Sequence, residues 1–237
     1  MKPETIENRW DILYRDYPEV YDAFASVPYE PRMIDVLQEK FNFNGKTVAD
    51  IGSGSGQSTM SIARYADHVV GLEPEVAMRT EAYKNTADAG LENISYLDGR
   101  AEDMPLEANS VDMVMALTAT MYPPREVIPV FINEARRVVR DGGVIVSVDV
   151  APGWYGGELS DVIDDPGAND DLQMKHQLFV EEHRFSYLDV IQTSYYGSIG
   201  KMLETYGFIF GKKAIEHIKK HRLSEMKWKF RAYYLES

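Results

Sequence analysis

A cluster of glycines directly after a short apolar segment restricts the fold of this chain more than any other feature. The segment Thr47–Ile51 runs into Gly52-Ser-Gly-Ser-Gly56, and its apolar character predicts a buried strand. Glycines at this place allow a sharp turn and let a ligand approach the main chain closely. Helical spacing follows over residues 57–65, and a helix N-terminus offers free N–H groups. The sequence therefore predicts a strand–turn–helix unit that holds a ligand.

Apolar segments and helical patterns continue to alternate up to residue 150. Further strands are predicted at His68–Leu72, residues 93–97, Val111–Leu117 and residues 144–150, and a final one at residues 226–235. Helices are predicted at residues 75–88 and from Val127 onward, with Pro129 in the first turn and Asp141-Gly-Gly143 as the end. Strands separated by crossover helices form a parallel sheet. We expect a doubly wound α/β fold.

The ends of the chain differ from this central part. Residues 1–44 are rich in aromatic residues and prolines, and we expect them to form a helical cap beside a cofactor-binding core at residues 45–150. Residues 151–184 form an insertion after the fifth strand, which we expect to act as a lid. Residues 185–237 complete a single domain over 1–237. The acidic segment at residues 164–171 lacks regular oxygen-ligand spacing, so we expect a solvated loop and no metal site.

Composition excludes several classes of protein. The 237 residues carry a formal net charge of −13, which does not suit a protein that grips phosphate backbones. The sequence has no cysteine, which excludes disulfides, cysteine-ligated zinc and a cysteine nucleophile. It also shows neither a signal peptide nor a membrane-spanning run. We therefore expect a cytoplasmic globular protein.

The residues around the glycines indicate which ligand they hold. Gln57 stands where a dinucleotide-binding loop has its third glycine, and the Gly-Lys-Ser/Thr of a phosphate-binding loop is absent. Asp50 would repel a pyrophosphate but suits a cationic group. Glu73 follows Asp50 by 23 positions, about the separation at which a carboxylate reaches the hydroxyls of a ribose. These residues favour a nucleoside that carries a positive charge.

Five segments in order now resemble the class I S-adenosylmethionine-dependent methyltransferases, of the small-molecule type. Residues 48–56 resemble the family's Asp/Glu-x-Gly-x-Gly-x-Gly motif, and Glu73 its acidic residue after strand two. Residues 98–106 resemble the Gly-Asp-Ala-Glu-x-Leu-Pro-Phe segment, residues 110–114 its Ser-Phe-Asp-x-Val strand, and residues 139–143 its Leu-Lys-Pro-Gly-Gly turn. The resemblance implies a mostly parallel, seven-stranded, Rossmann-like sheet with helices on both faces, N-terminal helices and an insertion after strand five.

The resemblance also implies a cofactor site for S-adenosylmethionine. The glycine backbone would hold the methionine moiety, Glu73 the ribose hydroxyls, the main chain near Arg100 the adenine, and Leu117-Thr118 the sulfonium. Arg100 stands where many relatives have Asp, so an acceptor for the adenine amine must come from elsewhere, such as Glu102 or Asp103. The full set of expected cofactor residues is Asp50, Gly52, Ser53, Gly54, Gly56, Glu73, Pro74, Arg100, Ala101, Glu102, Leu117, Thr118, Tyr14 and Tyr21.

The methyl acceptor is identified less directly. The family's Asn/Asp-Pro-Pro-Tyr signature of N-methylation is absent after strand four, where this chain has Met121-Tyr-Pro-Pro124. Candidate general bases are His176, His183 and Tyr122. Candidate acceptor-binding residues are Trp154, Tyr155 and Tyr195, because aromatic rings stack on planar or cationic groups.

Three functions stay open at this point. A small-molecule methyltransferase is favoured by the acidic charge and the insertion after strand five. An RNA or protein methyltransferase is supported only by the C-terminal part, where nine Lys or Arg residues stand against four Glu residues from Lys201 onward. A nucleotide-binding protein or NAD(P) oxidoreductase on a similar sheet is the third. The sequence does not identify the acceptor or the oligomeric state.

Overall fold

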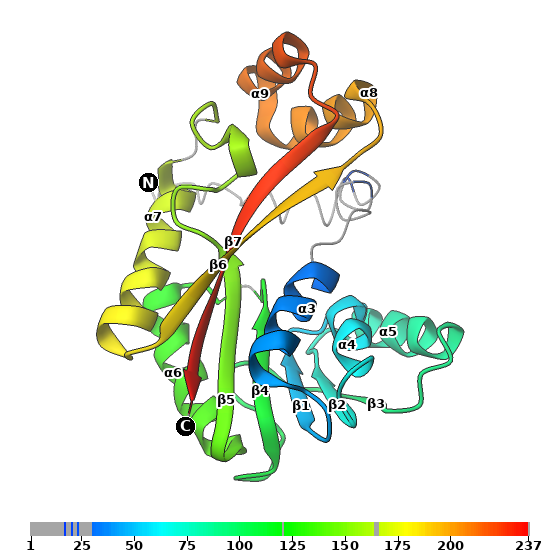
Figure 1. Cartoon of the computed structure of the whole chain (residues 1–237), viewed down its shortest axis with the longest axis vertical. Helices are drawn as coiled ribbons and strands as arrows, with labels where there is room; N and C mark the ends of the chain where they lie inside the picture. The colour runs from blue at the N-terminus through cyan, green and yellow to red at the C-terminus, as the bar shows by residue number, and fades with distance from the viewer. Residues whose placement is uncertain are drawn as a thin grey trace, which may run out of the picture. The chain divides into compact units, whose positions relative to one another are not determined.

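One sheet organises the part of the chain that the computed structural model describes, namely Tyr17, Val20, Ala23 and residues 30–119, 121–163 and 166–236. In these residues seven strands follow the order β3-β2-β1-β4-β5-β7-β6 (Figure 1). Strands β1 to β5 pair in parallel, and β7 runs antiparallel to β5. The predicted mostly parallel, seven-stranded sheet is confirmed. The strands are β1 (Thr47–Ile51), β2 (His68–Leu72), β3 (Ile94–Leu97), β4 (Val111–Leu117), β5 (Val139–Val150), β6 (Ser186–Tyr195) and β7 (Glu225–Glu236).

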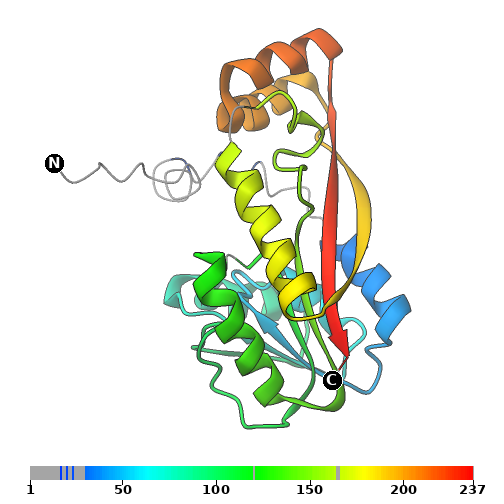
Figure 2. The same ribbon diagram turned by 90° about the vertical axis from the view of Figure 1, so that its left-hand side faces the viewer.

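Helices cover both faces of this sheet. Helix α4 packs on β1, β2 and β3, while α6 packs on β4, β5 and α7 (Figure 2). The helices are α3 (Glu30–Phe41), α4 (Gln57–Ala63), α5 (Val76–Asp88), α6 (Pro124–Val138), α7 (Pro166–His176), α8 (Ile199–Met202) and α9 (Phe208–His221). Three short segments add η1 (Gly157–Leu159), η2 (Gln177–Glu182) and η3 (Leu203–Gly207).

Strand β1 shows how the sequence pattern produces this burial. Ala49 and Ile51 belong to a core cluster that also contains Phe131 and Ile132 of α6. Successive side chains of a strand point to opposite faces, so Val48 and Asp50 point toward the face that α4 covers. All four residues are at most 1% exposed. A strand covered on both faces has an apolar sequence with no alternation, and β1 has this pattern.

The chain divides into two compact units. The larger unit comprises Glu30–Gly153, Pro166–Val190 and Lys229–Ser237, and the smaller comprises Met1–Tyr29, Trp154–Asp165 and Ile191–Trp228. In the smaller unit, Trp228 Nε1 donates to the buried Tyr206 hydroxyl at 2.7 Å, and the Tyr196 hydroxyl lies 3.3 Å from the same oxygen. These polar contacts satisfy aromatic side chains that apolar packing alone would leave unpaired.

Three local predictions were wrong. Helix α6 begins at Pro124, because the Pro123 carbonyl accepts from Val127 N at 3.0 Å, so Pro129 lies inside the helix. Strand β5 begins at Val139, because its glycines let it bulge beside β4 instead of ending the element: a Cβ on Gly143 would lie 2.6 Å from the Asp112 carbonyl. Residues 166–171 form part of α7, where Asn169 Oδ1 accepts from Gly153 N at 3.1 Å.

Candidate functional site

The glycine loop between β1 and α4 is pinned to the neighbouring strand by its own main chain. Gly52 N and Ser53 N both donate to the Leu72 carbonyl of β2, at 2.8 and 3.1 Å, and Gly56 N donates to the Ser53 carbonyl at 2.9 Å. All three loop glycines have positive φ, namely 71°, 54° and 88° for Gly52, Gly54 and Gly56. Residues that carry a side chain rarely adopt a positive φ, so the backbone conformation of the loop requires glycine at these positions.

Two of the glycines also permit close packing, and the third has room beside it for a side chain. A Cβ on Gly52 would lie 2.8 Å from Ala119 Cβ, and a Cβ on Gly56 would lie 2.4 Å from the Tyr96 hydroxyl. A Cβ on Gly54 would meet only Met78 Cε, at 3.9 Å. The loop is therefore held tightly on both sides, and its middle glycine is open to a bound group.

Asp50 and Ser53 turn inward from this loop. Asp50 is fully buried, and its Oδ2 accepts from the Ser58 and Thr59 hydroxyls of α4 at 2.7 and 2.6 Å. The carboxylate thus ties β1 to the first turn of α4, a role that the sequence did not predict. The Ser53 hydroxyl is buried next to Gly71 and has no hydrogen-bond partner among the described residues.

Glu73 is held against the glycine loop. Its carboxylate accepts from Gly54 N at 3.0 Å through Oε2 and from Glu75 N at 2.9 Å through Oε1. The side chain is buried, and Pro74 leads from it into α5. The structure therefore brings together two elements that the sequence predicted as parts of one site, the loop after β1 and the acid after β2.

Arg79 is a residue of this site that the sequence analysis missed. From α5 its Nη1 donates to the Glu73 carbonyl at 2.5 Å, and its Nη2 lies 3.4 Å from Asp98 Oδ2 after β3. Nothing in the local pattern distinguishes this arginine from a solvated one. Its partners are brought near by the pairing of β2 with β3.

The segment after β3 forms a tight turn. Arg100 N donates to the Asp103 carbonyl at 3.1 Å and Asp103 N to the Arg100 carbonyl at 3.2 Å, so both residues use their main-chain groups internally. Ala101 packs against the core cluster, and Glu102 is exposed. Ala101 and Glu102 lie between Arg100 and Asp103, the two residues whose hydrogen bonds close the turn.

Glu134 and Arg137 of α6 hold the chain just beyond this turn. Glu134 Oε2 accepts from Met104 N at 3.1 Å, while Arg137 donates to the Met104 and Leu106 carbonyls at 2.8 and 2.7 Å. The hydrogen bond from Arg137 to Glu134 lowers the pKa of the Glu134 carboxyl, which burial alone would raise. The sequence did not indicate this anchor either.

Strand β4 ends beside the glycine loop. Leu117 is buried, and Thr118 has a positive φ of 49° and donates through its main-chain N to the Val148 carbonyl at 2.8 Å. Ala119 then lies so close to Gly52 that a Cβ on Gly52 would be 2.8 Å from Ala119 Cβ. Tyr122 follows with its side chain 65% exposed, so its hydroxyl is open to solvent.

His176 lies in a cluster of aromatic and charged groups in the larger unit. Its ring is 5.3 Å from that of Tyr187 and 5.9 Å from that of Tyr233, and Arg231 Nη1 lies 3.2 Å from its Nδ1. Burial, with a smaller contribution from Arg231, lowers the pKa of His176. His183 terminates η2 with non-helical backbone angles, so the two histidines do not share one continuous helix.

The expected acceptor residues belong to the smaller unit. The Tyr155 ring lies 5.8 Å from that of Phe210, and Tyr195 is 62% exposed with its hydroxyl 3.5 Å from the Gly197 carbonyl. Trp154 accepts from Gly157 N through its carbonyl at 2.8 Å. Tyr14 and Tyr21 lie outside the described residues.

The described residues offer neither a metal site nor a membrane-spanning helix. Among them, no group of three or more His, Asp or Glu residues is arranged to hold a metal ion. None of the helices in this part of the chain has the length and apolar character needed to cross a bilayer.

Comparison with known proteins finds similarity to methyltransferases over the part of the chain that holds this site. Residues 48–143 match the family described as a methyltransferase domain. An uncharacterized methyltransferase of Synechocystis sp. is 29% identical over 152 residues, which are 62% of this chain and 68% of the relative. A Dictyostelium discoideum protein named as a methyltransferase is 28% identical over 144 residues, 61% of this chain and 51% of the relative. The chain spans about half the length of such curated relatives, which it covers to 51% and 42%.

Solved structures show the same fold at low sequence identity. A SAM-dependent methyltransferase from Aquifex aeolicus matches with a TM-score of 0.56 and 16% identity, over 98% of this chain and 100% of that chain. The YcgJ protein from Bacillus subtilis matches with a TM-score of 0.58 and 16% identity, over 86% and 96%. Residues 48–143 thus match a methyltransferase domain, and the fold is the one found in solved structures that include a SAM-dependent methyltransferase.

Proposed function

We propose that this chain transfers a methyl group from S-adenosylmethionine to a small-molecule acceptor by in-line displacement. The contact between Glu73 and Gly54 carries the proposal, because it joins a ribose-binding acid to a loop that is open at its middle glycine. A carboxylate offers about four lone-pair sites. Two are used by Gly54 N and Glu75 N, so Glu73 can accept from two ribose hydroxyls as well.

The remaining cofactor residues would contact the cofactor either through their side chains or through their main chain. When bound, S-adenosylmethionine supplies a methyl group on a sulfonium, and the protein mainly aligns the reactants and excludes water. The main chain of Gly52, Ser53, Gly54 and Gly56 would hold the methionine moiety. Leu117 and Thr118 would flank the sulfonium, and Tyr14 and Tyr21 would cover the cofactor.

Adenine recognition would use the turn after β3. Because Arg100 and Asp103 bond to each other through their main chains, the acceptor for the adenine amine would come from Ala101 or Glu102. The Arg100 side chain carries donors only. Pro74 precedes α5 and Met78 lies in its first turn, and both would line the same side of the nucleoside.

The acceptor is proposed to be a small molecule, because the net charge of −13 disfavours polyanionic partners. Trp154, Tyr155 and Tyr195 would bind it, and His176, His183 or Tyr122 would take up a proton where the reaction needs a base. We propose a cytoplasmic location and a single domain, in which residues 1–44 cap the site and residues 151–184 form a lid.

An RNA or protein acceptor is the second candidate. Helix α9 supports it, because Lys212 is 89% exposed and further cations follow on the same helix at Lys213, Lys219 and Lys220. Salt-dependent retention of RNA by the protein would favour this alternative. The match of residues 48–143 to a methyltransferase domain argues against the NAD(P) oxidoreductase.

Calorimetric titration with S-adenosylhomocysteine, with NAD in parallel, tests the cofactor. The unmodified chain should bind S-adenosylhomocysteine and not NAD. Glu73→Gln should weaken binding by about 10- to 100-fold, because a hydrogen bond to a charged group is lost. Glu75→Gln is the matched control, since it makes the same chemical change two residues away on an exposed side chain and should bind as the unmodified chain does. Binding of NAD alone, or no binding, would overturn the proposal.

A further inference from the structure

Three residues in register across neighbouring strands form a row behind the glycine loop. Asp50 of β1 pairs with Gly71 of β2, and Gly71 pairs with Tyr96 of β3. Side chains at paired positions of a sheet point to the same face. The middle position of the row has no side chain, so the residues on either side of it can approach each other across β2.

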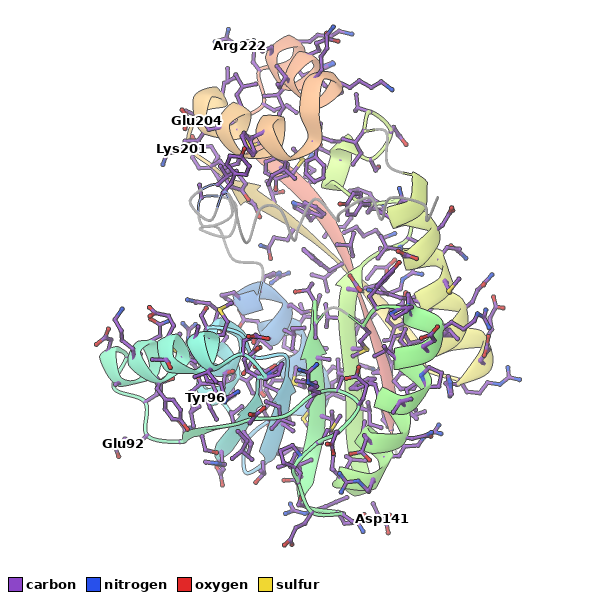
Figure 3. The ribbon with its side chains drawn as sticks, turned by 180° about the vertical axis from the view of Figure 1, so that it is seen from behind. Glu92, Tyr96, Asp141, Lys201, Glu204 and Arg222 are labelled. Carbon is purple, nitrogen blue, oxygen red and sulfur yellow. The ribbon has the colours of Figure 1, made fainter. Side chains whose placement is uncertain are left out.

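The Tyr96 ring occupies the space that Gly71 leaves. A Cβ on Gly71 would lie 2.5 Å from Tyr96 Cδ1 and 2.7 Å from its Cε1. At the far end of the ring, the hydroxyl lies where a Cβ on Gly56 would come within 2.4 Å. Tyr96, which is labelled in Figure 3, thus extends from β3 across β2 to Gly56, the residue that precedes α4. It is 4% exposed.

The Tyr96 hydroxyl is also bonded to its surroundings. It lies 2.9 Å from the Thr86 hydroxyl of α5. Burial raises the pKa of Tyr96, while hydrogen bonds with Thr86 and Thr59 partly oppose this rise. Thr59 is one of the two residues of α4 that donate to Asp50. The hydroxyl therefore stays protonated at neutral pH and links α5 to the first turn of α4.

We propose that Tyr96 is a positioning residue for the cofactor site. It supports the glycine loop from behind at Gly56, so the loop and the first turn of α4 keep the geometry in which their main chain meets the cofactor. The inference rests on the proposed function, since it assigns Tyr96 an effect on cofactor affinity. Tyr96 itself is buried, so its effect on the cofactor would pass through the glycine loop.

The test compares two variants that each lose one tyrosine hydroxyl. Tyr96→Phe should weaken S-adenosylhomocysteine binding about two- to tenfold, because the hydrogen bonds of its buried hydroxyl with Thr86 and Thr59 are lost. Calorimetry at a temperature well below the unfolding midpoint measures the change. Amide hydrogen exchange at residues 54–60 of the free protein should speed up, while exchange in β4 stays unchanged. Tyr83→Phe is the control, because the half-exposed Tyr83 bonds to the Tyr96 carbonyl at 3.0 Å and does not reach the loop.

A second pair of variants tests the steric part. Gly71→Ala should weaken binding, since its Cβ displaces the Tyr96 ring and also meets Ser53 Oγ at 2.9 Å. Adding Tyr96→Val should restore the unfolding midpoint relative to Gly71→Ala, because the ring is gone, but should leave binding weak.

The outcomes separate this inference from the proposed function. If the unmodified chain does not bind S-adenosylhomocysteine, the proposed function fails and the exchange measurement alone decides the role of Tyr96. If the unmodified chain binds, and Tyr96→Phe binds equally well with unchanged exchange, the positioning role is wrong and the function stands.

Discussion

Arg79 Nη1 donates to the main-chain oxygen of Glu73 at 2.5 Å. The same guanidinium lies 3.4 Å from Asp98, and its side chain is 16% exposed. One residue of α5 therefore joins the carboxyl ends of β2 and β3. The contact with Arg79 holds the main chain of Glu73 in place. Gly54 N and Glu75 N hold its carboxylate at the other end of the side chain.

Replacing the Arg79 guanidinium should leave Glu73 less firmly positioned. We expect Arg79→Met to weaken S-adenosylhomocysteine binding about tenfold, because a charge-assisted hydrogen bond to the Glu73 peptide is lost. Calorimetry measures the change. Lys84→Met on the same helix is the control, since Lys84 is 65% exposed and pairs with Glu81 at the surface. Equal affinity in Arg79→Met and the unmodified chain would show that Glu73 is positioned without this contact.

The buried carboxylate of Asp50 should matter for stability. Asp50→Asn should lower the free energy of unfolding by about 1–3 kcal/mol, because both hydroxyls of α4 lose a charged acceptor. Urea unfolding at neutral pH measures this, with the exposed Asp67→Asn as the control, expected within about 0.5 kcal/mol of the unmodified chain. A change no larger than that of the control would mean that α4 is held by apolar packing alone.

An ion cluster on β6 and β7 should make stability depend on acid pH. Asp189 accepts from Arg231 at 2.7 and 2.9 Å and lies 2.9 Å from Lys229 Nζ. Burial acts to raise the pKa of Asp189, but Arg231 and Lys229 outweigh it and lower the pKa. A carboxyl whose pKa is lower in the folded state stabilises the fold above its unfolded pKa, about 3.9, and loses this as the pH falls through the folded value.

The unmodified chain should therefore exceed Asp189→Asn in stability most clearly above about pH 5, with the difference shrinking toward about pH 3. Urea unfolding at a series of pH values gives the difference. Asp141→Asn, at an exposed turn of β5, should show no such trend. A difference that is constant with pH would contradict the assignment to this carboxyl.

His176 should affect the free energy of unfolding at a higher pH than Asp189 does. Its pKa is lowered by burial and by Arg231, so below about pH 6.5 the unfolded chain takes up a proton that the folded chain does not. Stability should fall as the pH decreases from about 7 toward the folded pKa. In His176→Gln this slope should be shallower, while His183→Gln keeps it. An imidazole titration by NMR at or above about pH 6.5 would contradict the direction of the shift.

Local sequence patterns predicted most of the fold. The strands β1, β2 and β4 begin and end where the apolar segments do, because strands buried on both faces need continuous apolar residues. Patterns failed where a tertiary contact replaced a local rule. Asp141-Gly-Gly143 would end an isolated helix, but beside β4 the same glycines allow a bulge in β5.

The sequence by itself determined that a glycine loop and an acid would meet at one edge of a parallel sheet, because both follow buried strands and parallel strands end together. The tertiary structure decided what holds them there. Tyr96 reaches Gly56 only because β2 has a glycine in register between β1 and β3. Arg79 reaches Glu73 only because α5 packs beside β3, which pairs with β2. Such contacts depend on strand register and helix packing, which no spacing along the chain encodes.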